Sequence, residues 1–345
     1  MKQINFVTIK SRNLRKDVIC MAVQQMPKEA EQIRAALEEK LNSELSATYE
    51  VSLKSVAKNN GVELIGLMIK DMEFPSVMPT IYIDGQIDSI KAGDASISEV
   101  VSEVARQYML APKEAVREEA SKIDFEHPQA HLEVKIVNFE KNREFLKDVP
   151  FRKIEDLAVI PMYRINAEAS FVIKNEHLPQ MGLSASECVD LAIQKVCEEG
   201  FSVISMADML RSMMGDEAVD IIGMGETPNM LVITNEAKIY GAAGAYIDMD
   251  VRAEIKDMFG GQDFYILPSS IHECLAVPAA MANVDDLTAM VREVNSTQVS
   301  ETEFLSDSVY YVDKQLHISI ASQTQAEADN QAHVQTQAPA EAMSM

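Results

Sequence analysis

The chain has 345 residues, of which 47% are hydrophobic and 25% are charged, the balance of an ordinary globular protein. At roughly 100–200 residues per domain, this length predicts about two domains, with a core that needs no disulfide or metal to hold it. The 54 acidic residues outnumber the 31 basic ones, and the formal net charge is −23 at pH 7. An acidic body repels phosphate, so the composition argues against nucleic acid and anionic membranes as partners.

The four cysteines are spread along the chain with no C-x-x-C pair, at Cys20, Cys188, Cys197 and Cys274. This usage favours a reduced, intracellular chain over a disulfide framework. Uncharged runs fall well short of the ~20 residues that a membrane-spanning helix needs. The short apolar stretch Val18–Val23 also lacks the small-residue cleavage site of a signal peptide. We therefore expect a cytoplasmic protein.

Residues 1–26 form a basic lead-in that fits no clear element, and residues 27–125 are predicted to form a small α+β module. A helix begins at Pro27 and carries an apolar residue at every fourth position. Three strands follow, and the first two are joined by Asn60-Gly61, which favours a tight hairpin because both residue types tolerate positive φ. A capping box, Ser96 with Glu99, begins the closing helix of this helix–three strands–helix module.

Residues 126–320 are predicted to form a larger α+β domain, and residues 112–130, which are polar and contain Pro112 and Pro128, include the join. A second capping box, Ser184 with Glu187, begins a helix that ends at Gly200. Other helices are expected over 250–259 and around 287–294. Strands are expected at 157–165, 170–174, 201–204, 230–234, 264–267, 271–277, 309–312 and 316–320.

Strands adjoin strands in this reading at least as often as they adjoin helices. That pattern predicts an α+β fold with mixed, mainly antiparallel sheets and flanking helices, rather than a doubly wound parallel sheet. Residues 321–345 are rich in Gln and Ala and hold Val334 as their one large aliphatic residue. Such a tail cannot bury enough apolar surface to offset its ordering entropy, and we expect it to be disordered.

Two neighbouring pairs of His and Glu are the candidate catalytic residues. Glu176-His177 follows a predicted strand, and His272-Glu273 sits inside the strand predicted over 271–277. A Glu beside a His can orient the imidazole or join it as a metal ligand. Adjacent residues of a regular strand point to opposite faces, so polar residues on an open sheet face are the alternative interpretation.

Three further patterns each have a functional and a structural interpretation. His127 and His131 have the spacing of zinc ligands on a helix, but Pro128 interrupts it, and solvated histidines at a helix start are the alternative. Cys274 with His272 would form a thiolate–imidazole pair or an inert buried thiol. The small-residue stretch 241–245, with Gly241 and Gly244, would cradle a phosphate or allow close packing.

The chain contains 21 methionines. Four of them form a helical stripe at 206, 209, 213 and 214, and those at 258, 281 and 290 fit core positions. The alternative is an adaptable surface for a partner, because the methionine side chain is flexible and polarisable.

Several phrases in series resemble a family of uncharacterised bacterial proteins, common in gut anaerobes and carried as a domain of unknown function. The resemblance spans about residues 27–313 and rests on the stretches 58–64, 79–82, 137–142, 148–153, 174–178, 264–273 and 291–295. A weaker likeness, over 183–196 and 260–277, is to another uncharacterised family of small cytosolic bacterial proteins. These resemblances imply a shared fold and bring no activity, cofactor or partner.

The sequence shows no complete catalytic constellation, no cluster of residues with metal-ligand spacing and no phosphate loop. We therefore expect a non-catalytic protein that acts by binding a protein partner or itself, without cofactor or metal. The alternative is a hydrolase, with or without a divalent metal, in which Glu176, His177, His272 and Glu273 meet in one cleft.

Overall fold

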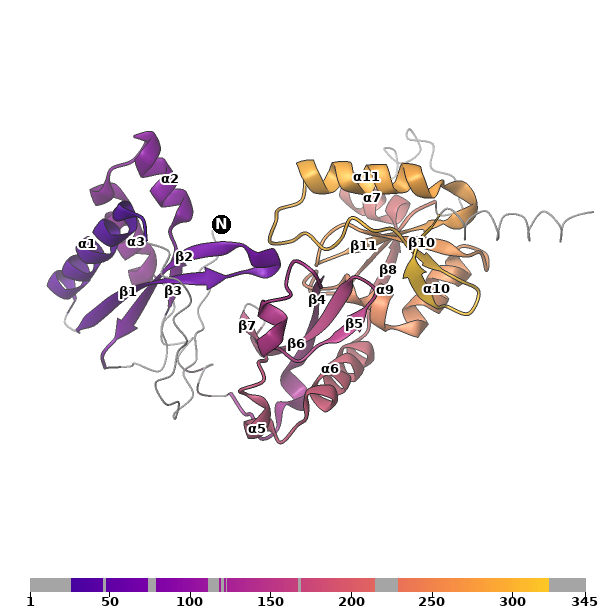
Figure 1. Ribbon diagram of the computed structural model, residues 1–345, viewed down its shortest axis with the longest axis horizontal. Helices are drawn as coiled ribbons and strands as arrows, with labels where there is room; N and C mark the ends of the chain where they lie inside the picture. The colour runs from indigo at the N-terminus through magenta and orange to yellow at the C-terminus, as the bar shows by residue number, and fades with distance from the viewer. Residues whose placement is uncertain are drawn as a thin grey trace, which may run out of the picture. The chain divides into compact units, whose positions relative to one another are not determined.

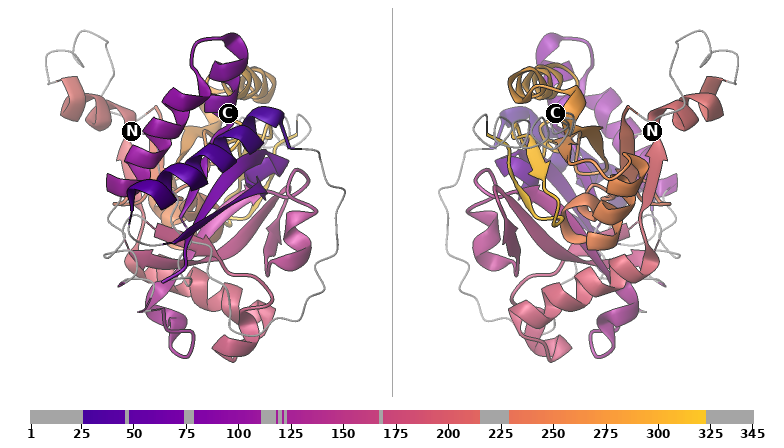
Figure 2. Two further views of the ribbon diagram at one scale, coloured as in Figure 1. Left: turned by 90° about the vertical axis from the view of Figure 1, so that its left-hand side faces the viewer. Right: turned by 90° about the vertical axis from the view of Figure 1, so that its right-hand side faces the viewer.

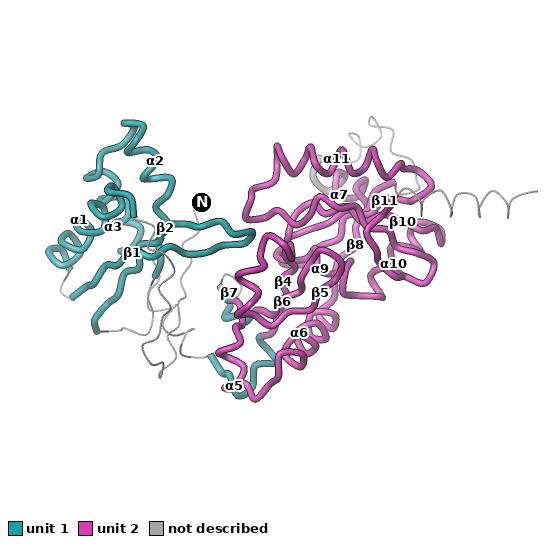
Figure 3. Tube along the Cα trace, viewed as in Figure 1, with its two compact units in different colours: residues 1–131, 163–171 teal, residues 132–162, 172–345 magenta. Residues whose placement is uncertain are grey.

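The protein is described by a computed structural model that covers residues 26–45, 48–73, 79–110, 118, 121, 123–166, 169–214 and 229–322. Two compact units make up the chain, one of residues 1–131 with 163–171 and one of residues 132–162 with 172–345 (Figure 3). The described chain is an α+β protein with mostly antiparallel sheets and flanking helices (Figure 1), as the sequence predicts. The predicted lead-in, apart from Met26, and the predicted tail, apart from residues 321 and 322, lie outside the described residues.

Unit 1 holds a three-stranded antiparallel sheet in the order β1-β2-β3. Its elements are α1 (Lys28–Glu44), β1 (Tyr49–Ala57), β2 (Glu63–Asp71), β3 (Thr80–Tyr82), α2 (Asp84–Ala92) and α3 (Ile97–Leu110). The helix α2, which the sequence patterns do not predict, ends at Gly93 with a φ of 81°. The capping box that begins α3 is confirmed, because the Glu99 carboxylate accepts the backbone N–H of Ser96 at 2.8 Å and the Ser96 hydroxyl accepts that of Glu99 at 3.3 Å.

The turn between β1 and β2 is a short 3-10 turn over Asn59–Gly61. Asn60 and Gly61 have φ angles of 62° and 72°, so the Asn-Gly prediction is confirmed. The backbone N–H of Lys58 donates to the Val62 carbonyl at 2.6 Å and closes the turn. The turn sets the register of the whole hairpin, in which Val51 lies opposite Ile69.

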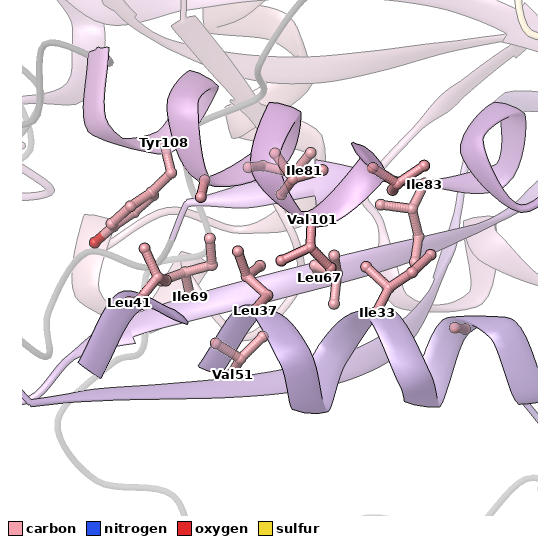
Figure 4. Close-up of a cluster of buried hydrophobic side chains, with 14 of the residues drawn as sticks. Ile33, Leu37, Leu41, Val51, Leu67, Ile69, Ile81, Ile83, Val101 and Tyr108 are labelled. Atoms are coloured by element: carbon pink, nitrogen blue, oxygen red, sulfur yellow. The ribbon is translucent and has the colours of Figure 1, made fainter. Parts of the chain in front are cut away.

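The core of unit 1 lies between one face of this sheet and the two helices α1 and α3 (Figure 2, left). The odd-numbered residues Val51, Leu67, Ile69 and Ile81 share that face, because the register places them opposite one another. Figure 4 shows Ile33, Leu37 and Leu41 of α1 turned toward Val101 and Tyr108 of α3, with the strand residues beside them. The four-residue spacing of the apolar side chains in α1 is therefore the spacing of a helix with one buried stripe.

Two further sheets follow in the chain. The first has the order β4-β6-β5, with β7 paired to β6, and the second has six strands in the order β13-β12-β10-β11-β9-β8. The strands are β4 (Leu132–Asn138), β5 (Arg152–Ile154), β6 (Leu157–Asn166), β7 (Ala169–Val172), β8 (Ser202–Ser205), β9 (Leu231–Thr234), β10 (Phe264–Pro268), β11 (Cys274–Pro278), β12 (Tyr310–Val312) and β13 (Ile318–Ile320). The helices are α5 (Leu178–Met181), α6 (Ala185–Glu199), α7 (Met206–Met214), α9 (Ala243–Ile247), α10 (Met249–Met258) and α11 (Val284–Thr297).

Helices cover both faces of the six-stranded sheet. On one face, Leu287 and Val291 of α11 pack against Tyr265 of β10 and Tyr311 of β12. On the other face, Tyr246 of α9 contacts the Tyr310 ring edge-on at 5.1 Å, and Phe259, which follows α10, contacts Phe264. Neighbouring strand residues therefore pack against different helices.

Two of the methionines predicted to be in the core are on the surface instead. Met281 is 64% exposed and Met290 is 40% exposed. The buried stripe of α11 consists of Val284, Leu287 and Val291, and Met290 lies one residue, or about 100° of helix rotation, away from Val291. Met281 lies in the short turn that precedes α11. The buried stripe of α11 is therefore narrower than the sequence pattern predicts.

A carboxylate joins the β5–β6 turn to the segment that leads into β12. Asp156 accepts hydrogen bonds from the hydroxyls of Ser306 at 2.6 Å, Ser308 at 3.1 Å and Tyr310 at 2.5 Å. The Tyr310 hydroxyl is buried, and burial together with the Asp156 charge raises the pKa of Tyr310 well above its ordinary value. Close by, the buried hydroxyl of Tyr246 has no hydrogen-bond partner among the described residues.

These two tyrosines give a matched pair of stability tests. We expect Tyr310→Phe to lower the free energy of unfolding by about 1–3 kcal/mol, because it removes a hydrogen bond to a carboxylate. We expect Tyr246→Phe to leave that free energy unchanged or to raise it, because it removes a buried hydroxyl that lacks a partner. Urea unfolding followed by circular dichroism measures both. Equal losses in the two variants would contradict this account of Asp156.

Candidate functional site

Glu176 and His177 lie in the short connection between β7 and α5. The imidazole Nδ1 of His177 accepts the backbone N–H of Lys174 at 3.0 Å, and Nε2 lies 4.0 Å from the Glu176 carboxylate. The His177 side chain is 16% exposed, whereas Glu176 is exposed. Burial lowers the pKa of His177, an effect that the Glu176 charge opposes. The lowered pKa favours the neutral form of the ring, and its hydrogen bond from the Lys174 N–H stabilises the loop that carries it.

His272 and Glu273 lie in the loop between β10 and β11, not inside a strand as the sequence predicted, because β11 begins at Cys274. The backbone of this loop forms hydrogen bonds within the loop and to another segment of the chain. The N–H of Ser270 donates to the carbonyl of Glu273, and the N–H of Ile271 donates to the carbonyl of Glu303. The hydroxyl of Thr234 also donates to the His272 carbonyl at 3.1 Å. Residues 269–273 therefore form a loop and are not part of the β10–β11 ladder, which ends at the pair Pro268 and Cys274.

The His272 side chain belongs to a cluster of four residues from four segments. Its Nδ1 accepts the backbone N–H of Tyr240 at 3.3 Å, and its ring stacks on the Tyr240 ring at 5.6 Å. The ammonium of Lys135, in β4, lies over the Tyr240 ring, with Nζ 5.3 Å from the ring centre. Nε2 of His272 is 4.0 Å from the Glu303 carboxylate. Tyr240 has a φ of 58°, a strained conformation for a bulky residue.

Both candidate histidines therefore share one arrangement. In each, Nδ1 accepts a backbone N–H and Nε2, which must carry the proton of the neutral ring, lies 4.0 Å from a carboxylate oxygen. A general base needs a nitrogen lone pair directed at substrate, and here the Nδ1 lone pair is used by the backbone. Each histidine has its own set of neighbours. Lys174 contacts His177, whereas His272 lies in a cluster with Tyr240, Glu303 and Lys135.

The described cysteines are thiols at neutral pH. Burial raises the pKa of Cys188 to about 11 and, together with the Asp248 charge, that of Cys197 to about 12. Burial also raises the pKa of Cys274, whose Sγ lies 3.7 Å from the Ala242 carbonyl. The thiolate is the nucleophilic form of cysteine, so these positions favour packing over the thiolate–imidazole interpretation.

His127 and His131 serve different neighbours. The His127 ring contacts the Asp124 carboxylate at 3.0 Å, whereas Nδ1 of His131 bonds to the Arg164 carbonyl at 2.9 Å and its ring stacks on Tyr163. In the part of the chain that the structure describes, no group of three or more His, Cys, Asp or Glu side chains is placed to hold a metal ion.

Gly241 and Gly244 allow close packing. A Cβ atom on Gly241 would lie 2.5 Å from the Asn235 backbone nitrogen, and one on Gly244 would lie 2.5 Å from the Phe201 ring. Such distances are shorter than side-chain carbons tolerate, so both positions require glycine. The helix that follows, α9, is a single short turn of five residues. These contacts favour the packing interpretation over a phosphate cradle.

Backbone hydrogen-bonding groups face outward at the edge of the unit 1 sheet, along β1. The even-numbered residues of β1 bond to β2, as the bond from the Met72 N–H to the Thr48 carbonyl shows at the end of the ladder. The odd-numbered residues therefore direct their N–H and C=O groups outward, away from β2. β1 is the first strand in the order β1-β2-β3, so these outward groups form the sheet edge.

Side chains of α1 complete the first half of this edge. Asn42 accepts the Tyr49 N–H at 2.8 Å and donates to the Tyr49 carbonyl at 3.0 Å, as a neighbouring strand would. One turn earlier in the helix, Glu38 accepts the Val51 N–H at 2.9 Å, and one turn before that Arg34 donates to the Val51 carbonyl at 3.4 Å. These bonds satisfy the outward groups of both strand residues.

The second half of the edge has no such caps among the described residues. Among the residues that the structure describes, none bonds to the outward N–H and C=O groups of Leu53, Ser55 and Ala57. A row of such groups is a template for pairing with another extended segment. Sequence patterns did not reveal this site, because the alternation of β1 shows which residues face the core but not whether a strand lies on its outer side.

These observations define an α+β protein with a partly capped, partly open sheet edge. Residues 30–314 match the profile of a family of unknown function (DUF5688), which covers most of the chain, and the protein belongs to this family. The resemblance to a family of unknown function seen in the sequence is thus confirmed. No curated protein and no solved structure matches the chain. No helix in the described residues combines the length and apolar character that crossing a membrane requires.

The His272 cluster predicts a pH dependence of stability. Burial lowers the pKa of His272 from about 6.5, the nearby Lys135 charge acts in the same direction, and Glu303 and Glu273 oppose it. The unfolded chain therefore binds this proton more readily than the folded one. The stability that the neutral ring provides is complete above about pH 6.5 and is lost as the pH falls below that value.

We expect His272→Asn to flatten the decline of the melting temperature between pH 7 and pH 5, because the amide oxygen can accept the Tyr240 N–H and does not titrate. His317→Asn is the control, since His317 is an exposed residue beside Asp313. Differential scanning calorimetry across this range measures the effect. A profile for His272→Asn as steep as that of the wild type would contradict the assignment.

Proposed function

We propose that this chain acts by binding an extended protein segment along the open edge of β1, from a partner or from a second copy of itself. The observation that carries the proposal is the row of outward N–H and C=O groups on Leu53, Ser55 and Ala57, to which no described residue bonds. An added strand satisfies these groups with main-chain hydrogen bonds, which supply affinity, while the flanking side chains supply selectivity.

The contrast within β1 supports this proposal. Folded proteins usually cover, shorten or charge their sheet edges to prevent unwanted pairing. Here α1 covers the edge at Tyr49 and Val51 with three polar side chains, and the cover stops where the open half begins. The backbone of the same edge is thus capped where α1 reaches it and, among the described residues, uncapped beyond that point.

The hydrolase alternative assigned acid–base roles to Glu176, His177, His272 and Glu273. The Nδ1 atoms of both histidines accept backbone N–H groups, so the observed hydrogen bonds support a role in holding loops. The alternative remains a prediction, and the binding proposal requires no chemical step from these residues.

A proline at position 55 tests the proposal. The N–H of Ser55 points outward, so Ser55→Pro removes an edge donor and blocks the edge with its ring, while it leaves the β1–β2 ladder intact. We expect the wild-type chain to form a complex, either with itself in sedimentation velocity or with a protein retained from extracts of its own cells. We expect Ser55→Pro to lose that complex and to keep a wild-type circular dichroism spectrum.

Ser55→Thr is the matched control, because it keeps the outward N–H and suits a strand. It should bind as the wild type does. Val56→Pro is a second control, because the N–H of Val56 lies in the ladder with β2, and this variant should disrupt the hairpin itself. A complex that survives Ser55→Pro, or the absence of any complex with the wild type, would overturn the proposal.

A further inference from the structure

The charges along β1 indicate what the added strand looks like, and this inference rests on the function proposed above. We propose that the strand comes from a different protein, that it is apolar on the side facing the helices, and that it carries a single carboxylate opposite Lys54 on the other side. The argument depends on the cross-strand neighbours of the edge residues.

Lys54 has no side chain opposite it within the sheet. Its partner in the register is Gly66 of β2, whose Cα has no room for a side chain because a Cβ would lie 2.6 Å from Thr80. Four residues earlier, Glu50 lies opposite Lys70 and forms an ion pair with it at 3.2 Å. In the described residues no carboxylate pairs with the exposed Lys54 ammonium, which can reach over the open side of β1.

The other charges at this end of the hairpin are already engaged. Nζ of Lys58 lies 4.0 Å from the centre of the Tyr82 ring, a cation–π contact, and the Glu63 carboxylate accepts the Ser55 hydroxyl at 2.8 Å. Among the described residues, Lys54 is therefore the cation available to an added strand. Opposite charges on directly neighbouring strand positions are favourable, so a Glu or Asp in the added strand is the complementary residue.

The helix side of the edge is apolar at its inner end. Leu53 is partly buried and packs against the core beneath α1 and α3, and an apolar side chain beside it would extend that core. Ser55 and Ala57 follow on the same face with small, exposed side chains. The open edge from Leu53 to Ala57 is roughly 14 Å long, so it accommodates about five residues before the bonds of Val51 to α1 stop further pairing.

A second copy of β1 fits this edge poorly. Residues 52–58 contain two lysines and no acidic residue. Antiparallel pairing of two copies about Ser55 would place Lys54 opposite Val56, with the two Lys54 residues diagonal to each other at about 7–8 Å. A lysine on an exposed edge is a common guard against self-pairing. The net charge of −23 adds repulsion between copies, and it also disfavours a partner with many acidic residues, hence the single carboxylate.

Two synthetic heptapeptides with blocked ends test the inference. The first is Val-Thr-Val-Glu-Val-Thr-Val, which presents valines on one side and one glutamate on the other. The second replaces the glutamate with lysine. Fluorescence anisotropy measures affinity, and the amide chemical shifts of Leu53, Ser55 and Ala57 locate the site. We expect the wild-type chain to bind the glutamate peptide about three- to ten-fold more tightly than the lysine peptide.

A charge reversal provides the decisive comparison. Lys54→Glu should invert the preference between the peptides, and Ser55→Pro should abolish binding of both. Lys91→Glu is the matched control, because Lys91 lies in α2 away from β1, and it should leave the preference unchanged.

Equal affinity for the two peptides, binding of neither, or a preference that survives Lys54→Glu would overturn this inference. It would leave the proposed function standing if Ser55→Pro still abolished the complex formed from cell extract. A homodimer that Ser55→Pro dissociates would likewise identify a second copy as the occupant, overturning the inference and sustaining binding at the edge. A complex that is insensitive to Ser55→Pro would contradict both the inference and the proposed function.

Discussion

Unit 1 depends on the register that the Asn60-Gly61 turn imposes on its hairpin. Side chains and backbone hydrogen-bonding groups both alternate with a period of two along a strand. One register therefore decides two things together: the odd-numbered residues of β1 face the helical core, and their N–H and C=O groups face the outer edge. A shift by one residue would exchange both properties, exposing Val51 and turning the outward donors into the sheet. Core and edge are thus consequences of the same turn.

The helix α1 connects these consequences. Its buried stripe, which includes Leu37 and Leu41, packs against the sheet, and the flanking Glu38 and Asn42 reach the backbone of the first strand. Packing and edge capping are therefore produced by neighbouring positions on one helix. The side chains of α1 bond to the outward groups of Tyr49 and Val51, and no described residue bonds to those of Leu53, Ser55 and Ala57.

Local signals predicted much of the fold, and contacts distant in sequence account for what was missed. The apolar spacing of α1, the Asn-Gly turn and the capping boxes each depend on residues within a few positions of one another, and the structure has them where the sequence indicated. His272 was predicted in a strand because it lies in the mostly apolar stretch 271–277, but Ile271 donates its N–H to the distant Glu303 carbonyl and the strand begins only at Cys274. The position of β1 at the sheet edge was not predicted, because the pattern of a strand does not show which other strands pair with it.

The hydrogen bonds of Asp156 have a consequence for synthesis on the ribosome. The carboxylate precedes its first partner, Ser306, by 150 residues. At about 5–20 residues per second, roughly 8–30 s pass before that serine is made. All core residues of unit 1 between Ala30 and Tyr108 precede Asp156 in the chain. The sheet edge of β1 can thus be folded, and can meet another polypeptide, while the larger unit is still being translated.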